Sequence, residues 1–296
     1  MSLLQKLSLL QLEENKVSSH EIKNEVYKFF ADIVFAKTGI FYPEKDYYRL
    51  DSRINNLMEK YSFETSDELY HAYKNSKTAD METYLIDICT NNETYFFRDT
   101  KPFDALAKDM IPAIQAQYPH ETINIWSCAS STGQEPLSII MSIFENLGSA
   151  TRFTFDATDI STKALSKAKS GLYTGLDVQR GLPIQLLMKY FEQKEDNEWQ
   201  AKSEILSKVN YSSFNLFTGP FVPEKYHVIF CRNVLIYQDT ENKVEILHKL
   251  AKTLKPGGFL ILGAGESLIG TKTDLAQKSL QNSMVFQRPN ETSTAA

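Results

Sequence analysis

One stretch of the chain decides its fold, and it reads Trp126-Ser127-Cys128-Ala129-Ser130-Ser131-Thr132-Gly133-Gln134-Glu135. The apolar run from Thr122 to Cys128 predicts a buried strand, and the apolar periodicity from Gln134 to Leu147 predicts a helix. Small residues between them let a ligand approach the backbone, and the first turn of a helix offers free N–H groups. The stretch therefore predicts a strand, a ligand-binding loop and a helix.

Strands and helices continue to alternate downstream of this unit. Further strands are predicted over 152–158, 226–231, 258–262 and 283–287, and helices over 161–170 and 240–254. Such alternation is typical of βαβ units, so we expect an α/β fold with a mainly parallel sheet. Residues 174–212 break the alternation, and we interpret them as an insertion outside the central sheet.

The N-terminal part of the chain predicts only helices. We expect a helical domain over residues 1–85, a linker and lid over 86–120, and the α/β domain over 121–290. The leucine-rich residues 3–12 predict an amphipathic helix, because the run is too short to span a bilayer and has no cleavage site. The tail from Asn290 to Ala296 is expected to be disordered.

Composition narrows the class of protein. The formal net charge of −5 argues against general nucleic-acid binding, which requires a basic surface. The three cysteines are widely spaced without a CxxC pair, which favours neither a disulfide framework nor a zinc site and fits a reducing cytoplasm. The five histidines show no metal-ligand spacing, so we expect no metal.

Polar residues directly after the predicted strands are the candidates for ligand binding, because α/β sheets bind ligands beyond the carboxyl ends of their strands. The first loop has one glycine, so the GxGxxG dinucleotide fingerprint is absent. Asp159 follows the second strand and can accept hydrogen bonds from ribose hydroxyls. An acidic pocket without a phosphate cradle suits a cationic nucleoside such as S-adenosylmethionine. The alternatives are an ordinary strand–helix turn and a helix-capping Asp159.

Two further segments carry polar and aromatic residues at expected pocket positions. Arg232-Asn233-Val234-Leu235-Ile236-Tyr237 follows a buried strand, and Thr90 to Asp99 joins the helical part to the sheet part. Domain junctions commonly form pockets, so the second segment is interpreted as a lid. Alternatively, Tyr237 is a core residue, and Tyr95, Phe96 and Phe97 only pack two domains together.

Together these segments resemble the chemotaxis receptor methyltransferase (CheR) family over residues 20–288. The matching motifs are Asn92-Glu-Thr-Tyr-Phe-Phe-Arg98, Trp126 to Ser138, Ala157-Thr-Asp159-Ile, Asn215-Leu216 and Phe230-Cys-Arg-Asn-Val-Leu-Ile-Tyr237. The resemblance implies a class I S-adenosylmethionine-dependent (Rossmann-like) methyltransferase sheet, an N-terminal all-α domain and a small β insertion. It also implies an enzyme that forms glutamyl methyl esters on cytoplasmic helices of methyl-accepting chemotaxis proteins, with S-adenosylhomocysteine as product.

The resemblance assigns cofactor contacts by motif position. They are Asn92, Thr94, Arg98, Glu135, Asp159, Asn215, Leu216, Arg232, Asn233 and Tyr237. No general base stands out, and none is needed, because a glutamate side chain, whose pKa in water is about 4.3, is already ionised at neutral pH. We predict that Arg98 and Tyr237 are the catalytic residues, which orient acceptor and cofactor.

Substrate recognition is predicted for Lys45, Arg49 and Arg53, which lie at i, i+4 and i+8 of the predicted helix after Pro43. Receptor helices of the resembled family are acidic, so this face could steer them; the alternative is a solvated helix face. Family members that bind a receptor's C-terminal pentapeptide carry a glycine-containing loop in the insertion. Residues 192–202 contain no glycine, so we predict pentapeptide-independent action.

Two alternative functions stay open at this point: a small-molecule methyltransferase with the same cofactor, and a non-catalytic module that binds S-adenosylmethionine or S-adenosylhomocysteine as a signal. We expect a cytoplasmic monomer without nucleic-acid binding or membrane insertion. The sequence itself leaves open the oligomeric state, the receptors and glutamates modified, and any regulators of the insertion.

Overall fold

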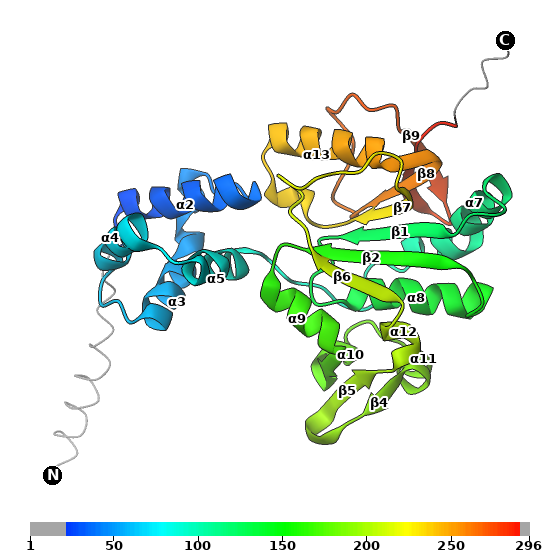
Figure 1. Cartoon of the computed structure of the whole chain (residues 1–296), viewed down its shortest axis with the longest axis horizontal. Coiled ribbons are helices and arrows are strands. Elements are labelled where there is room, and N and C mark those ends of the chain that lie inside the picture. Colours follow the sequence, from blue (N-terminus) through cyan, green and yellow to red (C-terminus); the bar gives the residue numbers. More distant parts are fainter. Residues whose placement is uncertain (1–21, 291–296) are drawn as a thin grey trace. The chain divides into compact units, whose positions relative to one another are not determined.

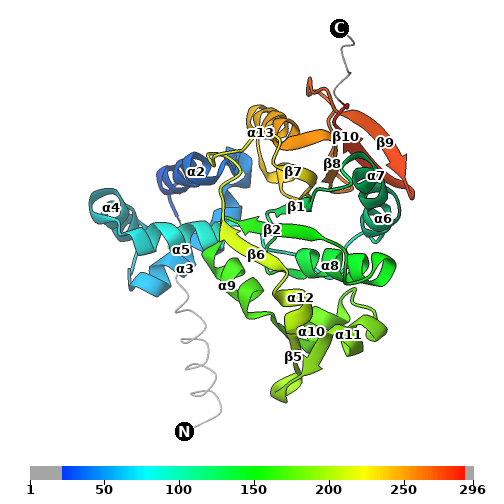
Figure 2. The same cartoon turned by 45° about the vertical axis from the view of Figure 1, so that its right-hand side comes forward.

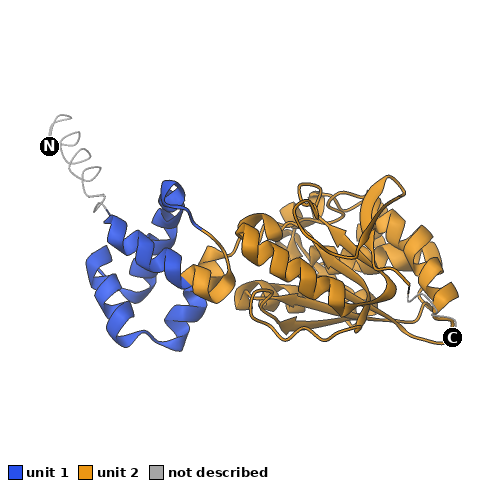
Figure 3. Cartoon of the chain, turned by 90° about the horizontal axis from the view of Figure 1, so that it is seen from above, with its two compact units in different colours: residues 1–33, 42–85 blue, residues 34–41, 86–296 orange. Residues whose placement is uncertain are grey.

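A computed structural model describes residues 22–290 of the chain. The expected helix at residues 3–12 and the tail beyond Asn290 lie outside the described residues. The described residues form two compact units, of which the first comprises residues 22–33 and 42–85 and the second residues 34–41 and 86–290 (Figure 3). None of the described helices combines the length and hydropathy that a membrane crossing requires.

The first unit is helical over its described residues, as the sequence predicts. Its elements are α2 (Asn24–Thr38), the 3₁₀ helix η1 (Glu44–Leu50), α3 (Asp51–Tyr61), α4 (Ser66–Ser76) and α5 (Ala79–Cys89), of which α2 and α5 continue into the second unit. Phe30, Leu50, Leu57 and Leu69 have no exposed surface and belong to its core.

The second unit is built on a seven-stranded sheet with the order β6-β2-β1-β7-β8-β10-β9, which can be followed in Figure 2. The strands are β1 (Ile123–Cys128), β2 (Phe153–Asp159), β6 (Val209–Ser213), β7 (Tyr226–Cys231), β8 (Leu254–Leu262), β9 (Ala276–Leu280) and β10 (Ser283–Gln287). The first five strands in this order, from β6 to β8, run parallel to one another, whereas β10 runs antiparallel to both of its neighbours. The predicted α/β class with a Rossmann-like sheet is confirmed.

Helices cover both faces of this sheet because side chains alternate along each strand. Ile125 and Phe230 belong to the core with α8 (Gln134–Leu147), while Trp126 and Ile229 belong to the opposite core with α13 (Thr240–Thr253). Figure 1 shows α8 and α13 on opposite sides of the strands. The remaining helices are α6 (Lys101–Ala105), the π-helix η2 (Leu106–Met110), α7 (Ile111–Gln117), α9 (Thr162–Ser170), α10 (Gly175–Gln179), α11 (Ile184–Tyr190), α12 (Ser203–Leu206) and the 3₁₀ helices η3 (Glu195–Asn197) and η4 (Leu235–Tyr237).

The insertion forms a small antiparallel sheet in the order β3-β5-β4, from β3 (Leu172–Thr174), β4 (Phe191–Gln193) and β5 (Glu198–Ala201). Its predicted bounds, 174–212, are wrong at both ends. The sheet begins at Leu172, and β6 belongs to the central sheet, where it pairs with β2. Only Tyr211 of β6 is buried, so this edge strand lacks the continuous apolar run of an inner strand.

Candidate active site

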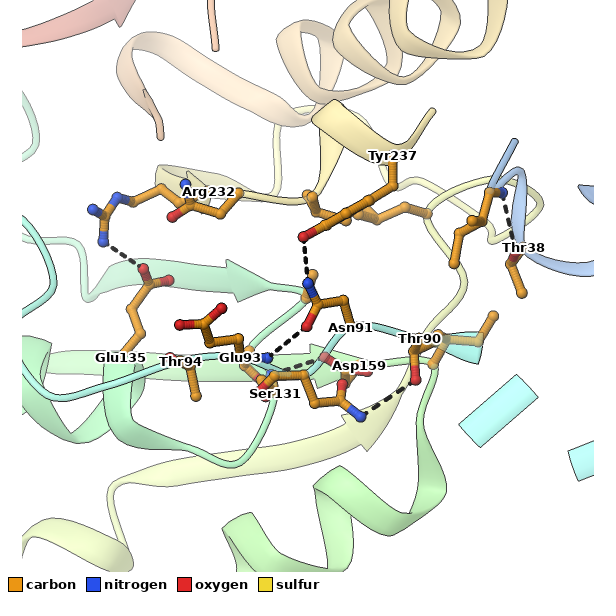
Figure 4. A pocket seen from close by; sticks show the side chains of 18 of the residues that line it. Thr38, Thr90, Asn91, Glu93, Thr94, Ser131, Glu135, Asp159, Arg232 and Tyr237 are labelled. Atoms are coloured by element: carbon orange, nitrogen blue, oxygen red, sulfur yellow. Dashed lines mark hydrogen bonds and ion pairs between the residues drawn. The ribbon is translucent and has the colours of Figure 1, made fainter. Parts of the chain in front are cut away.

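The carboxyl ends of the central parallel strands open into a pocket with about 880 Å³ of empty space, its opening to solvent included (Figure 4). The predicted cofactor contacts all line it: Asn92, Thr94, Arg98, Glu135, Asp159, Asn215, Leu216, Arg232, Asn233 and Tyr237. The structure therefore brings together five motifs that are far apart in the sequence.

The loop after β1 forms one wall of the pocket and has an unusual backbone. Ala129 and Ser131 have positive φ angles of 57° and 51°, and Gly133, the N-cap of α8, has a φ of 92°. A Cβ atom on Gly133 would lie 2.9 Å from the hydroxyl oxygens of both Tyr173 and Tyr211. Left-handed conformations of non-glycine residues cost free energy and gather at functional sites. The backbone of this loop is therefore strained where Ala129, Ser130 and Ser131 line the pocket.

Asp159 lies at the end of β2 and is only 5% exposed. Its two carboxylate oxygens accept hydrogen bonds from the backbone N–H groups of Ser131, at 2.8 Å, and Ser161, at 2.9 Å. Burial raises its pKa, and these hydrogen bonds oppose the rise. The N-cap of α9 is Ser161, whose hydroxyl accepts the Ala164 N–H, while Asp159 bonds to the backbone just before the helix and also lines the pocket. In the pocket, the Asp159 carboxylate can accept a hydrogen bond from a ribose hydroxyl.

Arg232 has its guanidinium bonded to protein groups rather than free in the pocket. The side chain is 1% exposed and makes ion pairs of 2.8 Å with both Glu135 and Asp99. It also donates to the carbonyl oxygen of Arg98 at 2.8 Å. Ser127 donates to the other Glu135 oxygen at 2.8 Å. Arg232 is therefore a positioning residue that fixes one pocket carboxylate and the end of the lid.

The predicted lid, residues 90–99, has two kinds of side chain with different roles. Phe96 has no exposed surface, and its ring lies 5.1 Å from Tyr173 and 5.6 Å from Phe191. The Ser131 hydroxyl donates to the Asn92 carbonyl oxygen at 2.8 Å, which ties the lid to the loop after β1. Phe96 thus anchors the segment within the core of the second unit rather than packing two domains together, while the polar residues of the segment line the pocket.

Residues 34–41 also contribute to the pocket, through Thr38 and Ile40. Ile40 forms an isolated antiparallel bridge with Gln238, and Asn215 donates from its side chain to the Lys37 carbonyl oxygen at 2.6 Å. The Asn215 side-chain oxygen accepts from the Phe217 N–H at 2.8 Å. The side-chain amide of Asn215 therefore holds residues 34–41 in place at this wall of the pocket. Sequence reasoning did not identify this part of the site.

Glu266 is a second residue that sequence reasoning missed. Its carboxylate is 5% exposed and accepts four backbone N–H groups: those of Asn233, Leu235 and Gly263 at 2.8 Å and that of Val234 at 3.0 Å. It thereby shapes the loop after β7, in which Asn233 has a φ of 58°. Glu266 lies four residues beyond the end of β8, so inspection of the residues after each strand could have found it.

Asn91, also missed, fixes the orientation of Tyr237. The Asn91 side-chain oxygen accepts the Glu93 N–H at 3.2 Å, so its NH₂ group faces Tyr237 and donates to the phenol oxygen at 2.6 Å. Because the phenol oxygen of Tyr237 accepts this hydrogen bond, its own proton points away from Asn91. Tyr237 lines the pocket rather than the core, and its hydroxyl is available as a donor to a bound group.

Replacing Asn91 with aspartate should turn this hydrogen bond around. Tyr237 would then donate to the new carboxylate and lose its donor function in the pocket. We expect turnover to fall about tenfold, because the loss of one hydrogen bond in the transition state raises the activation free energy by roughly 1.4 kcal/mol. The affinity for S-adenosylhomocysteine should change little. The check is a double-mutant cycle with Tyr237→Phe, in which the two losses should not add; additive losses would contradict the pairing.

Lys45, Arg49 and Arg53 lie in the first unit, outside the pocket. The prediction that they share one α-helical face is wrong for Lys45, because η1 is a 3₁₀ helix with about three residues per turn, which offsets residues four apart. The Arg49 guanidinium lies 5.4 Å from the Tyr42 ring centroid. Arg53 donates to the Arg49 carbonyl oxygen. Arg53 is thus partly structural, while Lys45 is exposed.

The residues present fit a cationic nucleoside. Asp159 offers acceptors for ribose hydroxyls, Phe214, Leu216 and Ile160 provide apolar surface for a base, and Glu135 adds negative charge. A doubly wound sheet with one antiparallel strand near its edge and this pocket at its carboxyl edge defines a class I S-adenosylmethionine-dependent methyltransferase.

Comparison with known proteins identifies the family. Residues 92–284 match the family described as "CheR methyltransferase, SAM binding domain". The chain belongs to the CheR methyltransferase family, and its cofactor is S-adenosylmethionine.

Relatives cover most of the chain. It is 37% identical over 254 residues to "Chemotaxis protein methyltransferase Cher2" of Pseudomonas putida, an alignment that covers 84% of this chain and 92% of the relative. It is 35% identical to a chemotaxis protein methyltransferase of Vibrio parahaemolyticus, over 84% of this chain and 91% of the relative. "Chemotaxis protein methyltransferase 1" of Pseudomonas aeruginosa is 36% identical, over 83% and 91% of the two chains.

Proposed function

We propose that this protein methylates glutamate side chains on the cytoplasmic domains of chemoreceptors, forming methyl esters in the cytoplasm. The observation that carries the proposal is the charge state of the pocket. None of the described residues that line it is His, Lys or Cys. Of its carboxylates, Glu135 is paired with Arg232, Asp159 is bonded to backbone N–H groups, and Glu93 is paired with Arg180. The pocket thus favours an acceptor that needs no deprotonation, such as a carboxylate.

Positioning is then the main task of the chain's own residues. S-adenosylmethionine, when bound, supplies a methyl group on a sulfonium, and a carboxylate oxygen must meet that carbon in line. Arg98 and Tyr237 both line the pocket and can donate to the acceptor's carboxylate. Good alignment can contribute about 7–11 kcal/mol to a rate enhancement. An arginine that bound the ground state tightly would offset part of this gain, so we assign Arg98 an orienting role.

The test of this function uses radiolabelled S-adenosylmethionine and receptor-rich membranes. We expect label in the receptor band, and we expect mild base to release it as methanol, because carboxyl methyl esters hydrolyse under conditions that leave N-methyl groups intact. Base-stable label, or label confined to small molecules, would contradict the proposal.

We propose that Arg49 and Lys45 bind the receptor, and that Arg53 supports the Arg49 backbone through its hydrogen bond to the Arg49 carbonyl oxygen. Reversing the charge at Arg49 with glutamate should raise the KM for receptor roughly three- to tenfold at low salt, since exposed pairs contribute up to about 1 kcal/mol each and reversal adds repulsion. Affinity for S-adenosylhomocysteine should stay the same. Lys74→Glu is the control, because Lys74 is an exposed lysine on α4 of the same unit. Equal effects of the two reversals would count against the assignment.

We also propose that the protein acts without a receptor pentapeptide. The turn between β4 and β5 is short, and Asp196 and Asn197 adopt positive φ angles of 56° and 60° in it without glycine. Such a turn supports the absence of an extended peptide-docking loop. Calorimetry with a receptor tail peptide should detect no tight binding; micromolar or tighter binding would overturn the proposal.

A further inference from the structure

Two arginines flank the Tyr95 ring beside the active-site pocket. The guanidinium carbon of Arg180, just after α10 in the chain, lies 4.3 Å from the ring centroid, and that of Arg98 lies 5.5 Å from it. Arg180 makes a 2.7 Å ion pair with Glu93. Both Glu93 and Arg98 line the pocket, where Figure 4 shows Glu93 close to Asn91 and Thr94. The group thus borders the pocket through Glu93 and Arg98.

The backbone around Arg180 is fixed while its side chain stays accessible. Gly181 has a φ of 88°, and a Cβ atom there would lie 2.0 Å from the Phe96 carbonyl oxygen. Only glycine permits this approach, which holds the segment against the lid. The Arg180 side chain is nevertheless 54% exposed. A group arriving from solvent can therefore reach a guanidinium whose position is set in advance.

The charges of this group are not balanced. Glu93 is the one carboxylate paired with Arg180 among the described residues, and the hydrogen bond from Arg180 is the main reason that its pKa is lowered. Arg98 donates to the Glu93 carbonyl oxygen at 3.3 Å, and its charge also contributes to the lowered pKa of Glu93, but Arg98 makes no ion pair within the described part of the chain. Two cations and one anion leave a net positive charge, which favours a second carboxylate.

We propose that Arg180, next to the charge of Arg98, forms a binding site for an acidic side chain of the acceptor helix beside the target glutamate, and that Glu93 occupies Arg180 when no acceptor is bound. The inference rests on the proposed function, since it assumes an acidic protein substrate. A carboxylate near the target glutamate would take the place of Glu93 on Arg180 and orient the helix over the pocket. Arg180 would then determine specificity for acidic sequences around the methylated residue.

A purely structural ion pair and this binding site make opposite predictions for Glu93. If the pair only ties the insertion to the lid, removing either partner should have the same effect. If Glu93 competes with the acceptor, Arg180→Gln should raise the KM for receptor about tenfold, whereas Glu93→Gln should lower it roughly threefold. Arg180→Lys should be intermediate, because an ammonium keeps the charge but loses the bidentate geometry.

The experiment uses the full-length chain and has two readouts. Initial rates with receptor-rich membranes at low salt give KM and kcat, and calorimetry gives the affinity of each variant for S-adenosylhomocysteine. A Glu-rich helical peptide added to the protein with bound S-adenosylhomocysteine reports anion binding without methyl transfer. Lys194→Gln is the matched control, since Lys194 lies on the same insertion and is paired with Glu192; it should leave both readouts unchanged.

Opposite shifts in KM and in peptide affinity for Arg180→Gln and Glu93→Gln are the expected result. Parallel shifts, or no shift for Arg180→Gln, would overturn the binding site while leaving the methyltransferase function intact. If the wild-type chain transferred no methyl to receptors, the proposed function would fail, and the peptide titration would still decide whether Arg180 binds carboxylates.

Discussion

Glu266→Ala should lower the free energy of unfolding by about 4 kcal/mol, a large part of the roughly 5–15 kcal/mol that stabilises a typical domain. The substitution leaves four backbone N–H groups without their acceptor. Each buried unsatisfied donor costs about 1–3 kcal/mol. We take the lower end, because a second cavity borders Glu266 and Gly263 and can admit water to them.

The same change should reduce turnover on the order of 100-fold, because displacement of a site residue by about 1 Å can cost that much. Glu266 holds Asn233 and Val234, which line the pocket. Urea unfolding and initial rates measure the two effects. Glu245→Ala is the control, because Glu245 is an exposed partner of Lys249 and should change stability by less than about 0.5 kcal/mol. A similar loss for both variants would refute the role of Glu266.

Arg232→Met should cost roughly 3–5 kcal/mol, the usual penalty for breaking a buried ion pair by removing one partner. The methionine fills much of the volume but leaves Glu135, whose side chain is 13% exposed, without its cation. Arg232→Lys should recover only part of the loss, because one ammonium cannot satisfy Glu135, Asp99 and the Arg98 carbonyl together.

A double variant separates stability from activity at this position. Adding Glu135→Gln to Arg232→Met removes the uncompensated charge, so we expect about 2 kcal/mol of stability to return. Turnover should stay low, because the Arg98 carbonyl oxygen still lacks its anchor. Thermal unfolding and single-turnover rates with receptor are the measurements. Recovery of turnover along with stability would show that Arg232 acts only through folding.

Much of the fold follows from local sequence patterns. Strands β1 and β7 are mostly apolar and almost entirely buried, and α8 and α13 have clear apolar faces, so their bounds are predicted within a residue or two. Strand β9 escapes prediction because its side chains are exposed or only partly buried, which leaves no apolar signal. Edge strands are defined by pairing with a neighbour, and a single sequence does not reveal that pairing.

The residues of the candidate site also fall into two groups: those that local sequence patterns predict and those that depend on distant contacts. Asp159 and Tyr237 follow apolar strands directly, so the position rule for α/β sheets finds them. Asn91, Arg180 and Glu266 act through long-range contacts with a phenol, a carboxylate and backbone N–H groups. Glu266 lies after a strand and could be found by the same rule, but the sequence does not show that its partners are backbone N–H groups, which are the same at every position.

Residues 34–41 limit which segments of this protein can be exchanged with those of a relative, in evolution or in the laboratory. They precede most of the helical unit in the chain, yet Thr38 and Ile40 line the pocket in which we place the cofactor. A shortened enzyme that began at residue 86 would lack that wall. A chimera that acquires new receptor preferences should therefore exchange residues 42–85 and retain 34–41, so that the specificity module can change without loss of the cofactor.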